Sequence, residues 1–154
     1  MNISIFGLGY VGCVGAACLA KLGHRVIGVN HTQGKVDLIN AGKPTIIEAE
    51  IDELVKEAHD NGRLTATTDY IYAVKNSDVS FICVGTPSGK DGHLNLSYIF
   101  RVARQIGEGI REKDGFHIVA IRSTVLPGTN RKVGEIIAEA SGKERGKDFT
   151  VVSN

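Results

Sequence analysis

The sequence lacks several features that mark whole classes of protein. Its 154 residues include no tryptophan, one methionine and three prolines. No apolar run approaches the roughly 20 residues that a membrane-spanning helix needs, and no charged leader precedes a long apolar stretch. The net charge is only +1, which gives no reason to expect nucleic acid or an anionic membrane as a partner. We therefore expect a cytoplasmic protein without a signal peptide.

Cysteine is also scarce. Cys13, Cys18 and Cys83 are odd in number, have apolar neighbours and lack the spacing of metal ligands. The five histidines show no metal-binding spacing either. We expect three packed, free thiols in a reducing compartment and no metal site.

Glycine, in contrast, is plentiful, with 19 residues, many at positions where a strand should end. Short runs rich in isoleucine and valine alternate with helical patterns. Such runs, with little polar alternation, are typical of parallel strands covered on both faces. The predicted strands are residues 3–6, 25–29, 64–67, 79–84, 117–121 and 149–152.

The predicted helices fill the gaps between these strands. They cover residues 10–22, 33–40, 48–61, 70–75 and 96–113, and a last helix runs from near Pro127 to about Ala140. Right-handed crossover connections then favour an α/β fold of the doubly wound, Rossmann type. We expect one domain over residues 1–154, with a mainly parallel six-stranded sheet and helices on both faces.

A glycine-rich turn joins the first strand to the first helix. Gly7, Gly9 and Gly12 fit the G-x-G-x-x-G pattern, in the strand–turn–helix context that makes it informative. Gly7 permits the tight turn, Gly9 lets the backbone approach a pyrophosphate, and Gly12 lets the helix pack against the strand. The alternative is a glycine turn that binds nothing.

The second predicted strand ends in Asn30. A carboxylate is expected here, about 20 residues after the loop, to bind the adenosine ribose of NAD. Asn30 keeps hydrogen-bonding capacity but removes the charge that repels a 2′-phosphate. Lys35 lies one turn further on, where it would reach a ribose or phosphate or simply extend into solvent.

The fourth and fifth predicted strands end in hydroxyl-bearing segments. Thr86 follows the fourth strand, and Ser123, Thr124 and Thr129 follow the fifth. In an open α/β sheet the ligand lies outside the carboxyl ends of the strands, so Thr86 and Thr124 suit the nicotinamide ribose. The alternative is that the hydroxyls after the fifth strand only cap the next helix.

Three motifs in order carry a resemblance to a known family. Residues 5–12 (IFGLGYVG), 81–87 (FICVGTP) and 122–129 (RSTVLPGT) resemble the UDP-glucose/GDP-mannose 6-dehydrogenase family, and the likeness extends along the whole chain. The resemblance implies two successive hydride transfers to NAD, which oxidise C6 of a sugar nucleotide to a carboxylate. It favours GDP-mannose as that sugar nucleotide and a role in polysaccharides such as alginate. The implied cofactor contacts are Tyr10, Val11, Lys35, Thr86, Thr124 and position 30.

The resemblance also implies a larger enzyme. The family's catalytic cysteine lies in a Gly-Gly-Ser-Cys-like motif in the C-terminal half, and no such motif occurs here. We therefore expect these residues to be the NAD-binding domain of a longer protein, without the middle helix and the sugar-nucleotide domain. The domain alone should be inactive, whereas the complete protein should be a homo-oligomer.

Two departures from the family pattern accompany this resemblance. Asn30 replaces the usual aspartate, and Glu48-Ala49-Glu50 stands near the usual Glu-Pro-Gly, which suggests an earlier helix start. Three alternatives stay open. They are a UDP-glucose 6-dehydrogenase domain, a 3-hydroxyacid or 6-phosphogluconate-type dehydrogenase, and a module that binds a dinucleotide without catalysis.

Overall fold

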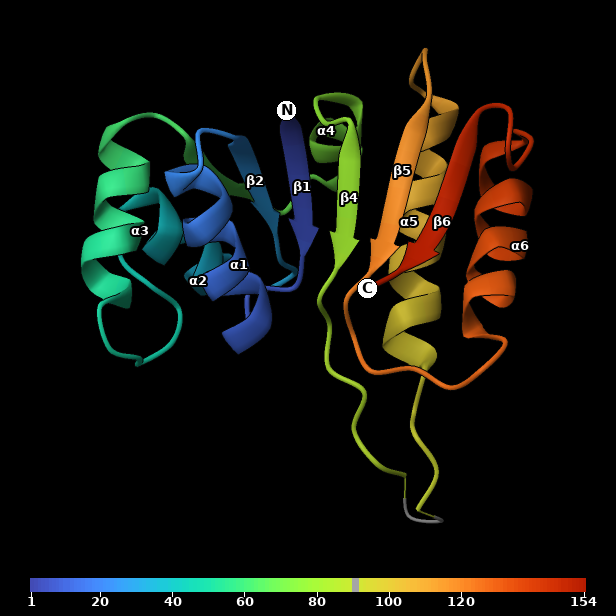
Figure 1. Ribbon diagram of the computed structural model, residues 1–154, viewed down its shortest axis with the longest axis horizontal. Coiled ribbons are helices and arrows are strands. Elements are labelled where there is room, and N and C mark those ends of the chain that lie inside the picture. Colours follow the sequence, from blue (N-terminus) through green and yellow to red (C-terminus); the bar gives the residue numbers. More distant parts are fainter. Residues whose placement is uncertain (90–91) are drawn as a thin grey trace.

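The structure is a computed structural model that describes residues 1–89 and 92–154. A single sheet runs through the molecule in the order β3-β2-β1-β4-β5-β6, and every neighbouring pair is parallel (Figure 1). The six-stranded, doubly wound arrangement expected from the sequence is therefore confirmed. The strands are β1 (Asn2–Phe6), β2 (Arg25–Val29), β3 (Leu64–Thr67), β4 (Val79–Ile82), β5 (His117–Ile121) and β6 (Phe149–Ser153).

Helices cover both faces of the sheet. Side chains of β1 to β3 pack against α1 (Tyr10–Lys21), α2 (Gln33–Asn40) and α3 (Ile51–Asp60) on one face. The opposite face packs against α4 (Tyr70–Lys75), α5 (Ser97–Arg111) and α6 (Thr129–Ser141), which lie behind the sheet in Figure 1. The order of the strands reverses direction between β1 and β4, so a crevice is expected there at their carboxyl ends.

Alternate side chains of each central strand enter the two cores. In β1, Ile3 and Ile5 pack on the α1 side, whereas Phe6 joins the core under α5. All three are almost fully buried, and each such side chain contributes about 1.5–3 kcal/mol of transfer free energy. Burial on both faces explains why these strands are rich in isoleucine and valine, although β1 also buries Ser4.

The start of α3 differs from the sequence-based prediction. We expected a helix from residue 48, but the helix begins at Ile51. Ile51 is buried, while Glu50 before it adopts a left-handed conformation with φ 62°. The preceding segment is held at the glycine loop, because the Thr45 hydroxyl donates to the Leu8 carbonyl at 2.7 Å. The chain must therefore turn sharply before α3, and the prediction of an earlier start was wrong.

The backbone at Glu50 yields a stability prediction. A left-handed conformation costs a non-glycine residue about 1–2 kcal/mol. Glycine avoids this strain, but its greater freedom in the unfolded chain costs about 0.5–1 kcal/mol of stability. Glu50→Gly should therefore raise the free energy of unfolding by up to about 1 kcal/mol, measured from urea midpoints.

The control for this prediction is Glu53→Gly, in the first turn of α3. Glycine at this right-handed position should lower stability by about 1 kcal/mol. Equal losses for the two variants would contradict the assignment of strain to Glu50.

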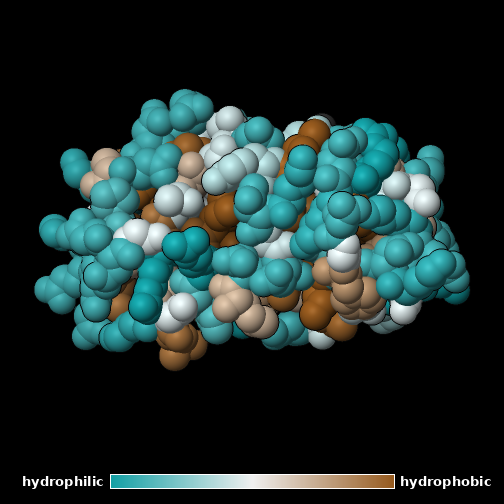
Figure 2. All heavy atoms as spheres, turned by 90° about the horizontal axis from the view of Figure 1, so that it is seen from above, coloured by the Kyte–Doolittle hydropathy of each residue, from teal (hydrophilic) through white to brown (hydrophobic). Residues whose placement is uncertain are grey.

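The two ends of the sheet differ in shape. The described part of the connection after β4, residues 83–89 and 92–96, projects from the carboxyl ends of the strands (Figure 1). Its described part contains an antiparallel bridge between Ser88 and Leu94, while residues 90–91 lie outside the described part. The opposite end presents mostly hydrophilic side chains (Figure 2). Within the described residues, no helix has the length and apolar character needed to span a membrane.

Candidate functional site

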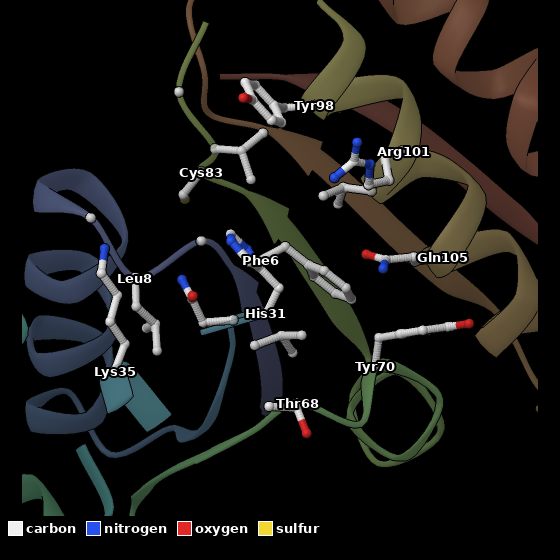
Figure 3. A pocket seen from close by; sticks show the side chains of 17 residues that line it. Phe6, Leu8, His31, Lys35, Thr68, Tyr70, Cys83, Tyr98, Arg101 and Gln105 are labelled. Carbon is white, nitrogen blue, oxygen red and sulfur yellow. The ribbon is translucent and has the colours of Figure 1, made fainter. Parts of the chain in front are cut away.

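A cavity of about 570 Å³ opens at the carboxyl ends of β1, β2 and β4 (Figure 3). Its volume is in the range of small-molecule and cofactor sites. It lies at the switch point of the sheet, where open α/β folds bind ligands. Its described lining is Phe6, Gly7, Leu8, Gly9, Val29, Asn30, His31, Lys35, Thr68, Tyr70, Cys83, Val84, Gly85, Tyr98, Arg101, Val102 and Gln105.

The glycine loop is packed so tightly that side chains are excluded at two of its positions. Gly7 has φ 101°, and a Cβ there would lie 2.8 Å from the carbonyl oxygen of Cys83. A Cβ at Gly12 would overlap the carbonyl oxygen of Gly7 and lie 2.9 Å from its carbon. The loop is thus pressed between the end of β4 and the first turn of α1.

Gly9 has a different environment from the other two glycines. It is the N-cap of α1 and lines the cavity, and a Cβ built there would meet no atom within 4 Å. Among the described residues no side chain caps this helix, so the N–H groups of its first turn are open to a ligand. Together with the partial positive charge of the helix end, they suit a pyrophosphate. The residues present therefore fit a dinucleotide.

Tyr10 and Val11 lie in that first turn and are exposed. The Tyr10 hydroxyl donates to the carbonyl of Ile47 at 3.4 Å, which ties the turn to the segment before α3. Neither residue belongs to the described lining of the cavity. Their predicted contacts with the cofactor stay predictions.

The end of β2 supplies Asn30, which lines the cavity together with Lys35 of α2. The side-chain oxygen of Asn30 accepts the backbone N–H of Thr32 at 3.0 Å. This bond fixes the orientation of the amide, because only the oxygen can accept. The NH₂ group of Asn30 then supplies N–H donors for a ligand, and its oxygen keeps a second lone pair.

The segments after β4 and β5 are tied to each other. The Ser123 hydroxyl lies 2.6 Å from the carbonyl of Val84 and 3.2 Å from that of Ile82. The N-cap of α6 is Gly128, and no side chain in the described part of the chain caps the helix, so the capping alternative for these hydroxyls is wrong. Thr86 is half-buried and Thr124 exposed, and neither is in the described lining. Their roles remain predictions.

Several lining residues were not predicted from the sequence. Tyr98, Arg101 and Gln105 come from α5, Thr68 comes from the connection between β3 and α4, and Tyr70 is the first residue of α4. The Arg101 guanidinium lies 5.7 Å from the centre of the Tyr98 ring, a cation–π contact. The sequence signal that could have identified the three residues of α5 is their spacing: they form a polar stripe at i, i+3 and i+7, next to the apolar stripe of the same helix.

The cysteines divide into two groups. Cys13 is buried in the core under α1, and burial raises the pKa of the Cys83 thiol to about 11, although the charge of Arg122 opposes this. Cys13 is therefore a packed, free thiol as predicted, whereas the free thiol Cys83 is only partly buried and lines the cavity. Cys18 is exposed, so its predicted packing was wrong. The buried face of α1 instead holds Ala16, Ala17 and Ala20, and Cys18 lies outside it. No group of potential metal ligands occurs among the described residues.

Known proteins share this arrangement. Residues 1–154 match the NAD binding domain of the UDP-glucose/GDP-mannose dehydrogenase family. The chain is 56% identical to GDP-mannose 6-dehydrogenase of Pseudomonas aeruginosa, and it is 43% identical to UDP-glucose 6-dehydrogenase of Rhizobium meliloti. These alignments cover 100% of the chain but only 36% and 34% of the two relatives.

A solved structure agrees with these sequence matches. The fold superimposes with a TM-score of 0.98 on a ternary complex of GDP-mannose dehydrogenase from P. aeruginosa, at 55% identity, covering 100% of this chain and 36% of that one. The chain thus spans about a third of the length of the relatives it matches. Its glycine loop, its uncapped first helix and its full-length match lead to one conclusion: the chain belongs to the UDP-glucose/GDP-mannose dehydrogenase family and corresponds to the NAD binding domain of that family.

Proposed function

We propose that this chain is the cofactor domain of a GDP-mannose 6-dehydrogenase. In such an enzyme, two successive hydride transfers to NAD convert GDP-mannose to GDP-mannuronate, a building block of polysaccharides such as alginate. The observation that carries the proposal is the open N-terminus of α1, with Gly9 facing a cavity at the switch point of the sheet. Bound NAD supplies the hydride acceptor.

The residues of this chain bind and orient the cofactor in this proposal. The first turn of α1 holds the pyrophosphate, and Gly9 leaves room for it. Asn30 and Lys35 hold the adenosine ribose, while Thr86 and Thr124 contact the nicotinamide half. Tyr10 and Val11 complete the turn around the phosphates. None of the three cysteines supplies the catalytic nucleophile, which we assign to the part of the enzyme outside these residues.

Two observations bear on the substrate and on catalysis. Identity to the GDP-mannose enzyme of P. aeruginosa exceeds identity to the UDP-glucose enzyme of R. meliloti, 56% against 43%, which favours GDP-mannose. A UDP-glucose 6-dehydrogenase domain is the second candidate. A module that only binds a dinucleotide is the third, because Asn30 replaces the usual acid.

The isolated chain tests the cofactor half of the proposal. Calorimetric titration should show binding of NAD⁺, and assays with GDP-mannose or UDP-glucose should show no NADH absorbance above background. No heat and no thermal shift at millimolar NAD⁺ would disprove cofactor binding. NADH formed by the chain alone would disprove the assignment of catalysis to another part.

A chimera tests the enzymatic half. This chain would replace the matching N-terminal segment of the P. aeruginosa enzyme, and NADH formation from GDP-mannose would be measured beside the unaltered enzyme. We expect activity within about tenfold of the parent, since both supply the same folded site. A chimera that folds and binds NAD⁺ but is inactive would favour the non-catalytic module.

A further inference from the structure

The lining of the cavity contains basic groups without acidic ones. His31, Lys35 and Arg101 line it, and no aspartate or glutamate belongs to its described lining. Figure 3 shows His31 in the middle of the view, between Lys35 from α2 and Arg101 from α5. Lysine and arginine are positively charged at neutral pH. The local field therefore attracts anionic groups, although the net charge of the whole chain is only +1.

The orientation of Asn30 adds a second, independent observation. Its oxygen accepts the backbone N–H of Thr32, so the uncharged amide brings N–H donors to the cavity where a carboxylate would bring none. A phosphate dianion only accepts hydrogen bonds and matches such donors. A carboxylate at this position would instead accept bonds from both ribose hydroxyls and repel a phosphate at the 2′ oxygen.

From these two observations, and resting on the proposed function, we infer that the site accepts a 2′-phosphorylated adenosine ribose, so that the domain takes NADP⁺ as well as NAD⁺. In this inference the amide of Asn30, the imidazole of His31 and the ammonium group of Lys35 bind the 2′-phosphate, and Arg101 adds positive charge from α5, across the cavity. The pyrophosphate does not compete for these groups, because the first turn of α1 binds it separately.

Titrations of the isolated chain with NAD⁺ and NADP⁺ test this inference. The two dissociation constants should lie within about tenfold of each other at low salt. Raising the salt concentration should weaken NADP⁺ binding more, because its additional phosphate interacts through charge. Asn30→Asp should shift the NADP⁺/NAD⁺ preference toward NAD⁺ by about tenfold or more, as one added negative charge repels the phosphate.

A matched pair of arginine variants locates the effect in the cavity. Arg101→Gln should weaken NADP⁺ severalfold more than NAD⁺. Arg104→Gln, an exposed position of the same helix outside the described lining, should leave both unchanged. Thermal unfolding of each variant checks that the fold is intact.

Each outcome separates this inference from the proposed function. If neither dinucleotide binds, the proposed function fails as well. If NAD⁺ binds but NADP⁺ is weaker by more than about tenfold, or if Asn30→Asp and Arg101→Gln leave the ratio unchanged, only the inference is overturned. The inference is supported if NAD⁺ and NADP⁺ bind with comparable affinities and both Asn30→Asp and Arg101→Gln shift the ratio of these affinities toward NAD⁺.

Discussion

Gly12→Ala is expected to destabilise the domain by about 3 kcal/mol and to abolish measurable NAD⁺ binding. The added Cβ would overlap the carbonyl oxygen of Gly7, which is backbone and can move only if the whole loop moves. Overpacking of this kind costs about 1–3 kcal/mol, and a rigid backbone neighbour places it at the upper end. A displaced loop can no longer present the first turn of α1 to the pyrophosphate.

Two other glycines provide matched controls for this variant. Gly15 lies in the middle of α1, and a Cβ there meets nothing within 4 Å. Gly15→Ala should therefore stabilise the protein by about 0.5–1 kcal/mol through helix propensity. Gly9→Ala should lower stability by no more than about 1 kcal/mol, because alanine is a poorer N-cap than glycine, but it should weaken NAD⁺ binding at least about tenfold, since its methyl group would enter the cavity.

Urea unfolding and calorimetric titration of the three variants decide the matter. If Gly12→Ala were as stable as Gly15→Ala, our claim that the glycine loop leaves no room for a side chain at residue 12 would be wrong. If Gly9→Ala bound NAD⁺ normally, the pyrophosphate would not lie against this turn.

Stability is expected to fall steeply below pH 6.5 because of His117. This residue is fully buried at the start of β5. Its Nδ1 lies 3.0 Å from Nζ of Lys113, which can only donate, so Nδ1 must accept. Its Nε2 therefore carries the hydrogen and donates to the Ser80 hydroxyl at 2.8 Å. Ser80 in turn bonds to Ser4 at 2.7 Å, so the neutral ring belongs to a buried polar network.

The charges around His117 oppose its protonation. Burial, and next the positive charge of Lys113, lower the pKa of His117 to about 3, while Asp78 acts weakly in the other direction. An unfolded histidine has a pKa near 6.5. Between about pH 6.5 and 3 the unfolded chain therefore binds a proton that the native protein does not. Stability is fully present above this window and decreases by about 1.4 kcal/mol per pH unit within it.

Chemical unfolding at pH 7 and pH 5 measures this effect. The wild-type protein should lose about 2 kcal/mol between these values from His117 alone. In His117→Gln the amide can still bond to Ser80, and this part of the loss should disappear. His31→Gln, at an exposed position, should keep the wild-type pH dependence. An equal loss in His117→Gln would assign the acid sensitivity to other groups.

Much of the fold was predictable because local patterns and the tertiary arrangement agree. The apolar runs of β1, β2 and β5 can be satisfied only by burial on both faces, and parallel strands require helical crossovers. The glycine loop was also predictable, since its spacing reflects backbone contacts within a single strand–turn–helix unit. The start of α3 was not, because Glu50 adopts its conformation to join a tethered segment to a buried Ile51.

The sequence by itself thus determined the strand–helix order, the glycine loop at the first turn and the position of Asn30 at the end of β2. Only the tertiary structure brought Tyr98, Arg101 and Gln105 of α5 to the same cavity as Asn30. Likewise, the buried bonds of His117 join residues as far as 37 positions apart. The spacing of apolar residues indicates which side of a helix or strand is buried. Contacts between elements that are distant in the sequence depend on how the sheet brings them together.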